Sequence, residues 1–201
     1  MIKSERSKNL SLVIMAIAFV TFMYGTIKAI GIVDRTQVGT SDGIYTSYVT
    51  TSEEIQRKAH ALTADCKSEL CEVQALLDFA TNIPYETKTF QRYSPQKTIQ
   101  QNFGDCDDKS NLLISMLHAL EKEAYFVLVP KHIFVIAAID DIQLAKRKGL
   151  WINGKKYYIL ESTAKNSRVG FPLHYTLEEI DVIVEPFSNE KIEIDKLEYR
   201  L

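Results

Sequence analysis

Cysteine, histidine and clustered basic residues are all scarce in this sequence of 201 residues. It contains three cysteines and four histidines, shows no extended basic cluster, and carries a formal net charge of −2 at neutral pH. Without residues 1–33 the chain has 20 basic and 25 acidic residues, a net charge of −5. An acidic chain of this kind is a poor ligand for nucleic acid or for an anionic membrane surface, so we expect neither as a partner.

Internal repeats and low-complexity tracts are also absent, and the length suits one domain with a hydrophobic core and an appendage. The appendage is an apolar segment at 10–33, whose single charge, Lys28, lies near the end, where it can snorkel. A bilayer is spanned by a helix of about 20 apolar residues. The segment therefore predicts a transmembrane anchor.

A cleavable signal peptide is the alternative interpretation of this segment, because AIG at 29–31 loosely resembles a cleavage site. The apolar run is longer than the ~7–15 residues of a signal peptide core, which favours an uncleaved anchor. Lys3, Arg6 and Lys8 precede the span, and little positive charge follows it. The positive-inside rule then predicts a cytoplasmic N-terminus at 1–9 and a periplasmic or extracellular remainder.

The remaining chain divides into a linker and a domain. Residues 34–52 are rich in Thr, Ser, Gly and Asp, which predicts a tether, and we expect the domain at 53–201. Apolar residues at helical spacing predict helices at 53–64, 68–82 and 106–122. Strand-forming runs follow at 125–129, 133–139, 150–153, 156–160 and 182–185, with a hairpin signal at Asn153-Gly154 and a short closing segment at 191–201. Helices followed by an antiparallel sheet indicate an α+β fold.

The three cysteines divide into a close pair and a single residue. Cys66 and Cys71 are five positions apart, and outside the cytoplasm such a pair predicts a disulfide. Zinc is less favoured because no second cysteine or histidine pair accompanies them, and two unlinked thiols are the third interpretation. The segment GDCDDK around Cys106 begins like a calcium-binding loop, but a lysine replaces the third oxygen ligand. We therefore expect no metal and no cofactor.

Cys106 lies at the expected start of the third helix. Unpaired amides at a helix N-terminus stabilise an anion, and a nearby imidazolium stabilises a thiolate further. The carboxylates of Asp107 and Asp108 act in the opposite direction, so a cation is required nearby. His132, at the start of a predicted strand, can supply that charge and transfer protons. Taken singly, the cysteine fits a buried structural thiol and the histidine a surface residue.

Glu161 ends another predicted strand, and we expect its carboxylate at the same edge of the sheet as His132. A carboxylate in that position fixes the imidazole tautomer and stabilises the imidazolium. Taken alone, Glu161 is equally well interpreted as an exposed glutamate at the end of a strand. Together with Cys106, the two residues predict a nucleophile, a base and an orienting acid.

The order and spacing of these residues resemble the transglutaminase-like superfamily, in its bacterial cysteine-peptidase type. The resemblance covers about 68–165 and rests on GDCDDK at 104–109, on His132, and on WINGKKYYILEST at 151–163. It implies a papain-like α+β fold in which the cysteine is the nucleophile, the histidine the base, and Glu161 stands where the superfamily usually has Asp.

The superfamily also places an oxyanion-stabilising group ahead of the cysteine. Gln100 and Gln101 are the candidates by spacing, with the Cys106 amide as the other donor. Each glutamine is also interpretable as an ordinary loop residue.

The resemblance implies acyl transfer from an amide of a protein or peptide substrate through a thioester. Water as the acceptor gives a peptidase or amidase, and a lysine amine gives a protein-crosslinking transglutaminase. The small single domain favours hydrolysis. A catalytically weak module that binds partners in a membrane-associated assembly is the alternative, because Glu161 departs from the usual Asp and carboxylates crowd Cys106.

Overall fold

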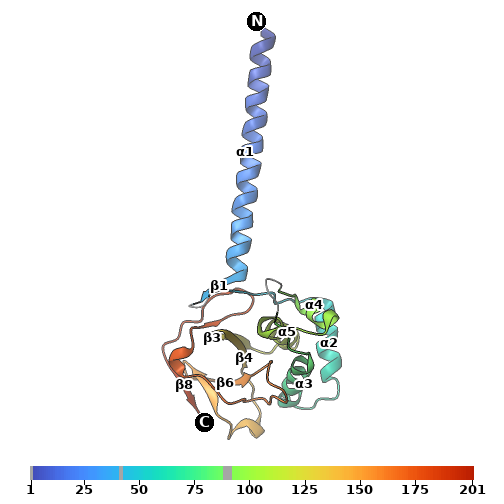
Figure 1. Cartoon of the computed structure of the whole chain (residues 1–201), viewed down its shortest axis with the longest axis vertical. Helices are drawn as coiled ribbons and strands as arrows, with labels where there is room; N and C mark the ends of the chain where they lie inside the picture. Colours follow the sequence, from blue (N-terminus) through green and yellow to red (C-terminus); the bar gives the residue numbers. More distant parts are fainter. Residues whose placement is uncertain (1, 41–42, 88–91) are drawn as a thin grey trace. The chain divides into compact units, whose positions relative to one another are not determined.

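A long helix, α1 (Ile2–Thr36), contains the apolar segment near the N-terminus (Figure 1). The computed structural model describes residues 2–40, 43–87 and 92–201, which divide into two units, Met1–Gln37 and Val38–Leu201. Within α1, the segment Asn9–Lys28 has a mean hydropathy of 2.1, and none of it is buried against the rest of the protein. By length and composition this helix fits a membrane span, and an N-terminal signal sequence passes the same test.

The two threonine hydroxyls within the candidate span are bonded to the helix itself. Thr21 Oγ1 donates to Ile17 O at 3.0 Å, and Thr26 Oγ1 donates to Met23 O at 2.9 Å. This back-bonding satisfies both hydroxyls in an apolar environment. The basic side chains ahead of residue 9, which carry the predicted orientation, lie outside the described side chains.

An antiparallel sheet forms one half of the second unit. It contains β3 (Ala124–Val129), β4 (His132–Ala137), β5 (Gly149–Ile152), β6 (Lys155–Leu160), β7 (Val182–Val184) and β8 (Leu197–Arg200). The strand order is β7-β3-β4-β6-β5-β8. The α+β fold class predicted from the sequence is confirmed, with strands close to the predicted positions.

Tight turns join the strands that carry the site. Val129 pairs with His132, so the β3–β4 connection consists of Pro130 and Lys131. Asn153 and Gly154 connect β5 to β6, with φ angles of 49° and 86°. Two consecutive positive φ angles are what a two-residue antiparallel hairpin requires, and Asn-Gly tolerates them.

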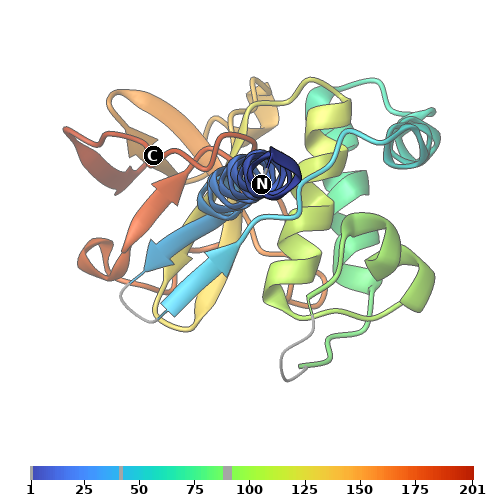
Figure 2. The same cartoon turned by 90° about the horizontal axis from the view of Figure 1, so that it is seen from above.

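Four helices form the other half of this unit (Figures 1 and 2). They are α2 (Glu53–Thr63), α3 (Glu69–Asn82), α4 (Pro95–Gln101) and α5 (Cys106–Ala119). Each begins after a capping side chain that accepts a hydrogen bond from the first turn: Ser52, Ser68, Ser94 and Asp105. The helix α4 is not among the helices predicted from the sequence, because its seven residues are too few to show an apolar period.

The sheet has a different apolar cluster on each face. Along β4, Ile133 and Val135 join the cluster that contains α5, and Phe134 and Ile136 join the cluster on the opposite face. Alternation of this kind follows from the two-residue period of a strand. The helix α5 packs on β3 and β4 and is buried over most of its length. The start of α5 and the start of β4 are therefore both fixed by the core.

Part of the predicted tether at 34–52 belongs to the second unit. It contains β1 (Gln37–Thr40) and β2 (Gly43–Thr46), and the boundary between the two units falls after Gln37. The buried Tyr45 ring lies 5.2 Å from the Phe126 ring, centroid to centroid. This part differs from the expected linker because a few isolated apolar residues anchor it, and their sequence pattern is too sparse to predict a strand.

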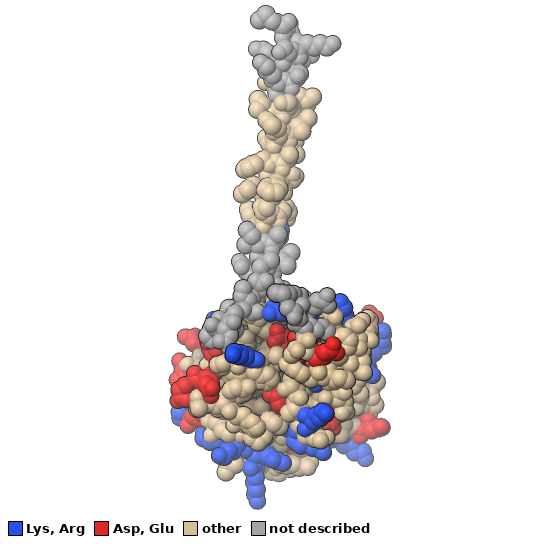
Figure 3. Space-filling view, in the orientation of Figure 1, with Lys and Arg blue, Asp and Glu red and all other residues tan. Residues whose placement is uncertain are grey.

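The second unit also contains a disulfide and a mixed surface charge. Cys66, after α2, is joined to Cys71 in the first turn of α3, with a Cα–Cα distance of 5.4 Å. Cys106 is a free cysteine. On the face shown in Figure 3, basic and acidic side chains are interspersed. This pattern agrees with the absence of an extended basic cluster from the sequence.

Candidate active site

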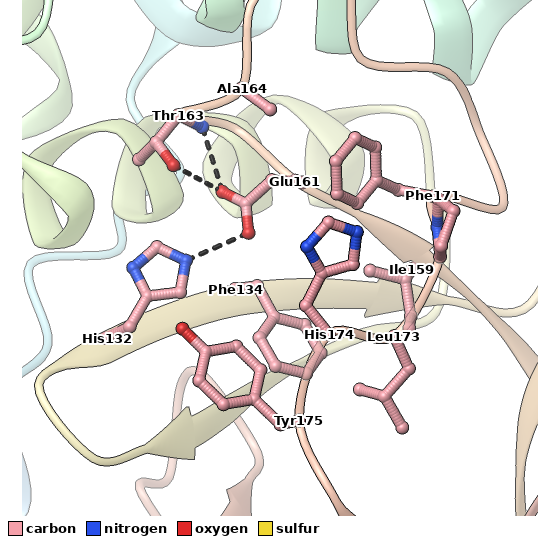
Figure 4. A pocket seen from close by; sticks show the side chains of 11 residues that line it. His132, Phe134, Ile159, Glu161, Thr163, Ala164, Phe171, Leu173, His174 and Tyr175 are labelled. Atoms are coloured by element: carbon pink, nitrogen blue, oxygen red, sulfur yellow. Dashed lines mark hydrogen bonds and ion pairs between the residues drawn. The ribbon is translucent and has the colours of Figure 1, made fainter.

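His132 begins β4 and Glu161 directly follows β6, its neighbour in the sheet. The two side chains meet where β4 begins and β6 ends (Figure 4). The register pairs Val135 with Leu160, so Glu161, one residue further, lies opposite Phe134 and on the same sheet face as His132. A long side chain reaches its diagonal neighbour on such a face. The His132 Nε2 atom lies 2.8 Å from Glu161 Oε2.

Glu161 is fixed from its other side by Thr163. Its Oε1 atom accepts hydrogen bonds from the Thr163 backbone N–H at 3.0 Å and from the Thr163 hydroxyl at 2.6 Å. Burial alone raises the pKa of Glu161, which is 8% exposed, but the hydrogen bonds from His132 and Thr163 lower this pKa below its ordinary value. Glu161 is therefore an ionised acceptor at neutral pH.

The protonation of the His132 ring follows from that carboxylate. An ionised carboxylate accepts but does not donate, so the hydrogen between the two groups resides on His132 Nε2. The Nδ1 atom is then the unprotonated nitrogen, and it points away from Glu161 (Figure 4). This tautomer provides a proton acceptor directed away from its orienting acid.

Cys106 is the first residue of α5, and the turn before it is fixed by a reciprocal cap. The Asp108 amide donates to Asp105 Oδ1 at 3.2 Å, and the Asp105 amide donates to Asp108 Oδ2 at 3.4 Å. Asp108 Oδ1 also accepts a hydrogen bond from the Tyr93 amide at 2.7 Å. These bonds hold the start of the helix, and with it the backbone of Cys106, in one position.

Gly104 allows the chain to approach this cap closely. A Cβ atom at Gly104 would lie 2.8 Å from Asp108 Cβ, which is closer than real contacts permit. The Gly104 amide donates to Pro84 O, and its carbonyl accepts from the Glu86 amide, each at 3.1 Å. The glycine therefore joins the segment after α3 to the start of α5 without displacing the capping residue.

The face of α5 that carries Cys106 is directed toward the segment that carries Glu161. Ser110, one turn after Cys106 and on the same helix face, lies with its Oγ atom 3.2 Å from Ser162 Oγ. Ser162 directly follows Glu161 in the chain. In the part of the chain that the structure describes, no hydrogen bond joins the thiol to His132, and the thiol donates to Asp107 Oδ1 at 3.7 Å.

Burial raises the pKa of the Cys106 thiol to about 12, with further contributions from Asp107 and Asp105. Burial and Asp105 raise the pKa of Asp107 to about 6, although Arg92, whose Nε lies 3.7 Å from Asp107 Oδ2, opposes the shift. At neutral pH the thiol is therefore protonated beside an ionised carboxylate. This differs from the thiolate expected from the sequence, because burial and two carboxylates outweigh the helix amides.

Sequence reasoning missed the role of Lys109, which is 1% exposed. Its ammonium group donates to Ile83 O at 2.8 Å and to Thr81 O at 3.4 Å, at the end of α3. Burial lowers the pKa of Lys109 to about 8, although the charge of Glu161 acts to raise it. The lysine therefore ties α5 to α3, and its charge is directed to backbone carbonyls rather than to the thiol.

Tyr175 is a second site residue that the sequence pattern did not reveal. Its ring stacks on His132 with 6.2 Å between centroids and 20° between planes. Burial and the charges of Glu161, Glu179 and Cys106 raise the pKa of the Tyr175 phenol. Tyr175 lies in a loop 43 positions after His132, and no local pattern connects the two.

The predicted oxyanion residues lie on α4. Gln100 and Gln101 are both exposed there, and their role stays a prediction. The described residues contain no group of three His, Cys, Asp or Glu side chains arranged to hold a metal ion.

Comparisons with known proteins find one family similarity, which covers part of the chain. The model of the transglutaminase-like superfamily matches residues 56–133, which include Cys106 and His132 and end before Glu161. No curated protein matches the sequence.

Among solved structures, the chain is similar to a candidate cysteine protease from Cytophaga hutchinsonii, with 22% identity and a TM-score of 0.44 over 59% of this chain and 39% of that one. It is also similar to a candidate protease from Parabacteroides distasonis, with 18% identity and a TM-score of 0.44 over 70% of this chain and 27% of that one. The chain thus spans well under half the length of either protein. The resemblance predicted from the sequence is confirmed to the extent that the model of this superfamily matches residues 56–133 of the chain.

Proposed function

We propose that this protein is a cysteine peptidase or amidase in which Cys106 attacks an amide carbonyl, His132 transfers the proton, and Glu161 orients His132. The observation that carries the proposal is the 2.8 Å contact between His132 Nε2 and Glu161 Oε2, at the sheet edge toward which the Cys106 face of α5 is directed. A buried carboxylate bonded to a histidine beside a cysteine-bearing helix start is the arrangement that activates a thiol.

The first half of the reaction forms a thioester. His132 Nδ1 takes the thiol proton as Cys106 Sγ bonds to the carbonyl carbon of the substrate. His132 then gives that proton to the amide nitrogen, the C–N bond breaks, and the amine leaves. Because the pKa of Cys106 is raised to about 12, the thiol does not ionise in advance, and the base acts during the attack.

The second half releases the acyl group. Water attacks the thioester carbon while His132 Nδ1 accepts one of its protons, and the C–S bond breaks as the proton returns to the sulfur. The products are a carboxylic acid and the free enzyme. A lysine amine in place of water would give a crosslink, and transamidation is accordingly the second outcome of the same chemistry.

We further propose that α1 anchors the protein in a membrane, with its N-terminus in the cytoplasm and Val38–Leu201 outside it. Support comes from the mean hydropathy of 2.1 over Asn9–Lys28 and from the basic residues that precede this span. The substrate would then be a protein or peptide of the bacterial envelope, periplasm or exterior.

The test uses the full-length protein in detergent micelles. It is incubated with a peptide library and the products are identified by mass spectrometry, alongside Cys106→Ala and His132→Ala. We expect new carboxyl termini with the wild type and none with either variant. His60→Ala, which changes an exposed histidine of α2, is the matched control and should cleave normally. Cleavage that persists in Cys106→Ala would contradict the proposal.

A non-catalytic binding module is the second candidate. The raised pKa of Cys106 and its carboxylate neighbours favour it, because a protonated thiol is a weak nucleophile. Wild type and Cys106→Ala would then give identical peptide mixtures, and a membrane-associated partner would be retained equally by both.

A further inference from the structure

A pocket of about 370 Å³ opens beside the His132–Glu161 pair (Figure 4). Its floor contains Phe134 and Ile159, which belong to the apolar cluster on the sheet face opposite α5. The segment 171–175 forms the wall of the pocket. Other lining residues are Thr163 and Ala164, and the wall consists of Phe171, Pro172, Leu173, His174 and Tyr175. Most of the lining is aromatic or aliphatic.

The wall of the pocket is held in place by backbone hydrogen bonds. The amides of Gly170 and Phe171 both donate to Ile159 O at 3.1 Å, which fastens the start of the wall to β6. The Leu173 amide donates to the Tyr199 hydroxyl at 3.1 Å, which fastens its middle to β8. The pocket is therefore formed before any ligand enters, and its size is within the range of about 300–1,000 Å³ common for small-molecule sites.

The position of the pocket suits the part of the substrate that follows the scissile bond, on the side of the leaving amine. Cys106 packs against the apolar cluster that contains α5, whereas the pocket floor belongs to the opposite cluster, and His132 itself lines the pocket. In acyl transfer the carbonyl carbon bonds to sulfur and the leaving nitrogen receives its proton from the histidine. The chain that continues from this nitrogen therefore runs past His132, on the side where the pocket lies.

The lining also selects the chemistry of the ligand. An apolar wall and floor favour a side chain that has no polar groups to desolvate. The ionised Glu161 in the lining repels a carboxylate, and among the described residues no Lys or Arg lines the pocket to attract one. Aromatic rings at Phe134, Phe171 and Tyr175 offer stacking surfaces to another ring.

We propose that this pocket binds the side chain of the residue that supplies the leaving amine, and that this side chain is aromatic or large and aliphatic. The inference rests on the proposed function and adds the substrate class to it. In the reverse sense, an amine that carries such a side chain is the preferred acceptor for the acyl group on Cys106.

Aminolysis of the acyl-enzyme tests the proposal directly. Full-length protein in micelles is acylated with a peptide thioester, which transfers its acyl group to Cys106 and releases the thiol. Phenylalaninamide, leucinamide, serinamide and aspartic acid α-amide then compete with water, and the products are separated by mass. We expect phenylalaninamide and leucinamide to capture the acyl group about tenfold or more better than serinamide, with the acidic amide poorest. Equal capture of all four would overturn the proposal.

A variant that fills the pocket provides the internal control. Ala164→Phe places a ring into the cavity and should abolish the preference for phenylalaninamide over serinamide. Ala61→Phe adds the same ring on the exposed face of α2 and should keep the wild-type preference. A preference that survives in Ala164→Phe, with normal thermal unfolding, would place the selective contact elsewhere and overturn the proposal.

A binding measurement separates failure of this proposal from failure of the proposed function. Cys106→Ala, which cannot form a thioester, is examined by saturation-transfer NMR with phenylalaninamide and serinamide. Selective saturation of phenylalaninamide that disappears in Cys106→Ala/Ala164→Phe supports the pocket even when the wild type forms no acyl-enzyme. An acyl-enzyme that forms without selectivity in either measurement supports the reaction and overturns the pocket assignment.

Discussion

Cys106 Sγ donates a hydrogen bond to Asp107 Oδ1 at 3.7 Å, so the proposed nucleophile faces a carboxylate. This contact and burial together explain why the pKa of the thiol is raised to about 12. A protonated thiol avoids alkylation and oxidation, which require the thiolate. In the proposed reaction, His132 removes the proton when substrate is bound.

Replacing Asp107 should make the thiol more reactive. Asp107→Asn removes a negative charge next to Cys106, so the pKa of the thiol should fall. At about pH 8, well below that pKa, each unit of decrease raises the thiolate fraction tenfold, and we expect iodoacetamide to react about tenfold faster or more. Asp65→Asn, an exposed change after α2, is the control. An unchanged alkylation rate would show that the charge of Asp107 does not contribute to the pKa of the thiol.

Replacing Glu161 should impair the reaction more than binding. In Glu161→Gln the carboxamide can donate to His132 Nε2, which favours the tautomer with hydrogen on Nδ1 and removes the proton acceptor. We expect kcat to fall by about 10²-fold or more with KM little changed. Steady-state kinetics on a peptide that the wild type cleaves would measure this. Glu54→Gln, in the exposed first turn of α2, should retain full activity.

The same residue should give a defined dependence of stability on pH. The pKa of folded Glu161 is lower than its unfolded value of about 4.3, so its stabilising contribution is present above that value and is lost as pH falls through the folded pKa. The free energy of unfolding of wild type should exceed that of Glu161→Gln by about 1–3 kcal/mol near pH 6. Urea titrations should show this gap closing toward about pH 3. A gap that is constant with pH would mean that the charge of Glu161 is not involved.

The parts of the fold that could be predicted are those with local signals. The helices α2, α3 and α5 lie close to the predicted ranges, and Asn153-Gly154 forms the expected hairpin. The contact between His132 and Glu161 was also accessible, because both residues stand at strand ends on one edge of an antiparallel sheet. The predicted positions of the two strands were sufficient to predict that these two side chains lie close together.

The parts that could not be predicted depend on contacts between distant segments. The partners of Lys109 are carbonyl oxygens at the end of another helix, and no sequence motif predicts them. Tyr175 reaches His132 because its loop folds back over the sheet. The carboxylates near Cys106 are visible in the sequence, but the burial that contributes most to its raised pKa is a tertiary property.

The buried lysine should be structurally important and should respond to alkaline pH. Lys109→Met leaves the carbonyls of Ile83 and Thr81 without this donor, which should cost about 1–3 kcal/mol in the free energy of unfolding. The pKa of Lys109 is lowered to about 8, below its unfolded value of about 10.4, so between these values the unfolded chain binds more protons. Stability relative to Lys109→Met should therefore shift in favour of the wild type as pH rises through this window.

Denaturant titrations between about pH 7 and about pH 10 would measure that shift. Lys67→Met changes an exposed lysine before α3 and should be close to neutral at every pH. A variant as stable as the wild type would mean that water replaces the ammonium at the two carbonyls.

The oxidation state of Cys66 and Cys71 tests the proposed location of the second unit outside the cytoplasm. The structure joins the two sulfurs across the connection between α2 and α3, and such a bond persists outside the cytoplasm but is reduced inside it. Protein taken from its native membrane, denatured and treated with a maleimide without reductant, should therefore gain a single label, on Cys106. Three labels should appear after reduction, and a variant with both Cys66→Ser and Cys71→Ser should gain one label under either condition. Three labels on the unreduced wild type would place this unit in the cytoplasm, because exported protein has no route by which to keep both thiols free beside each other in an oxidising compartment.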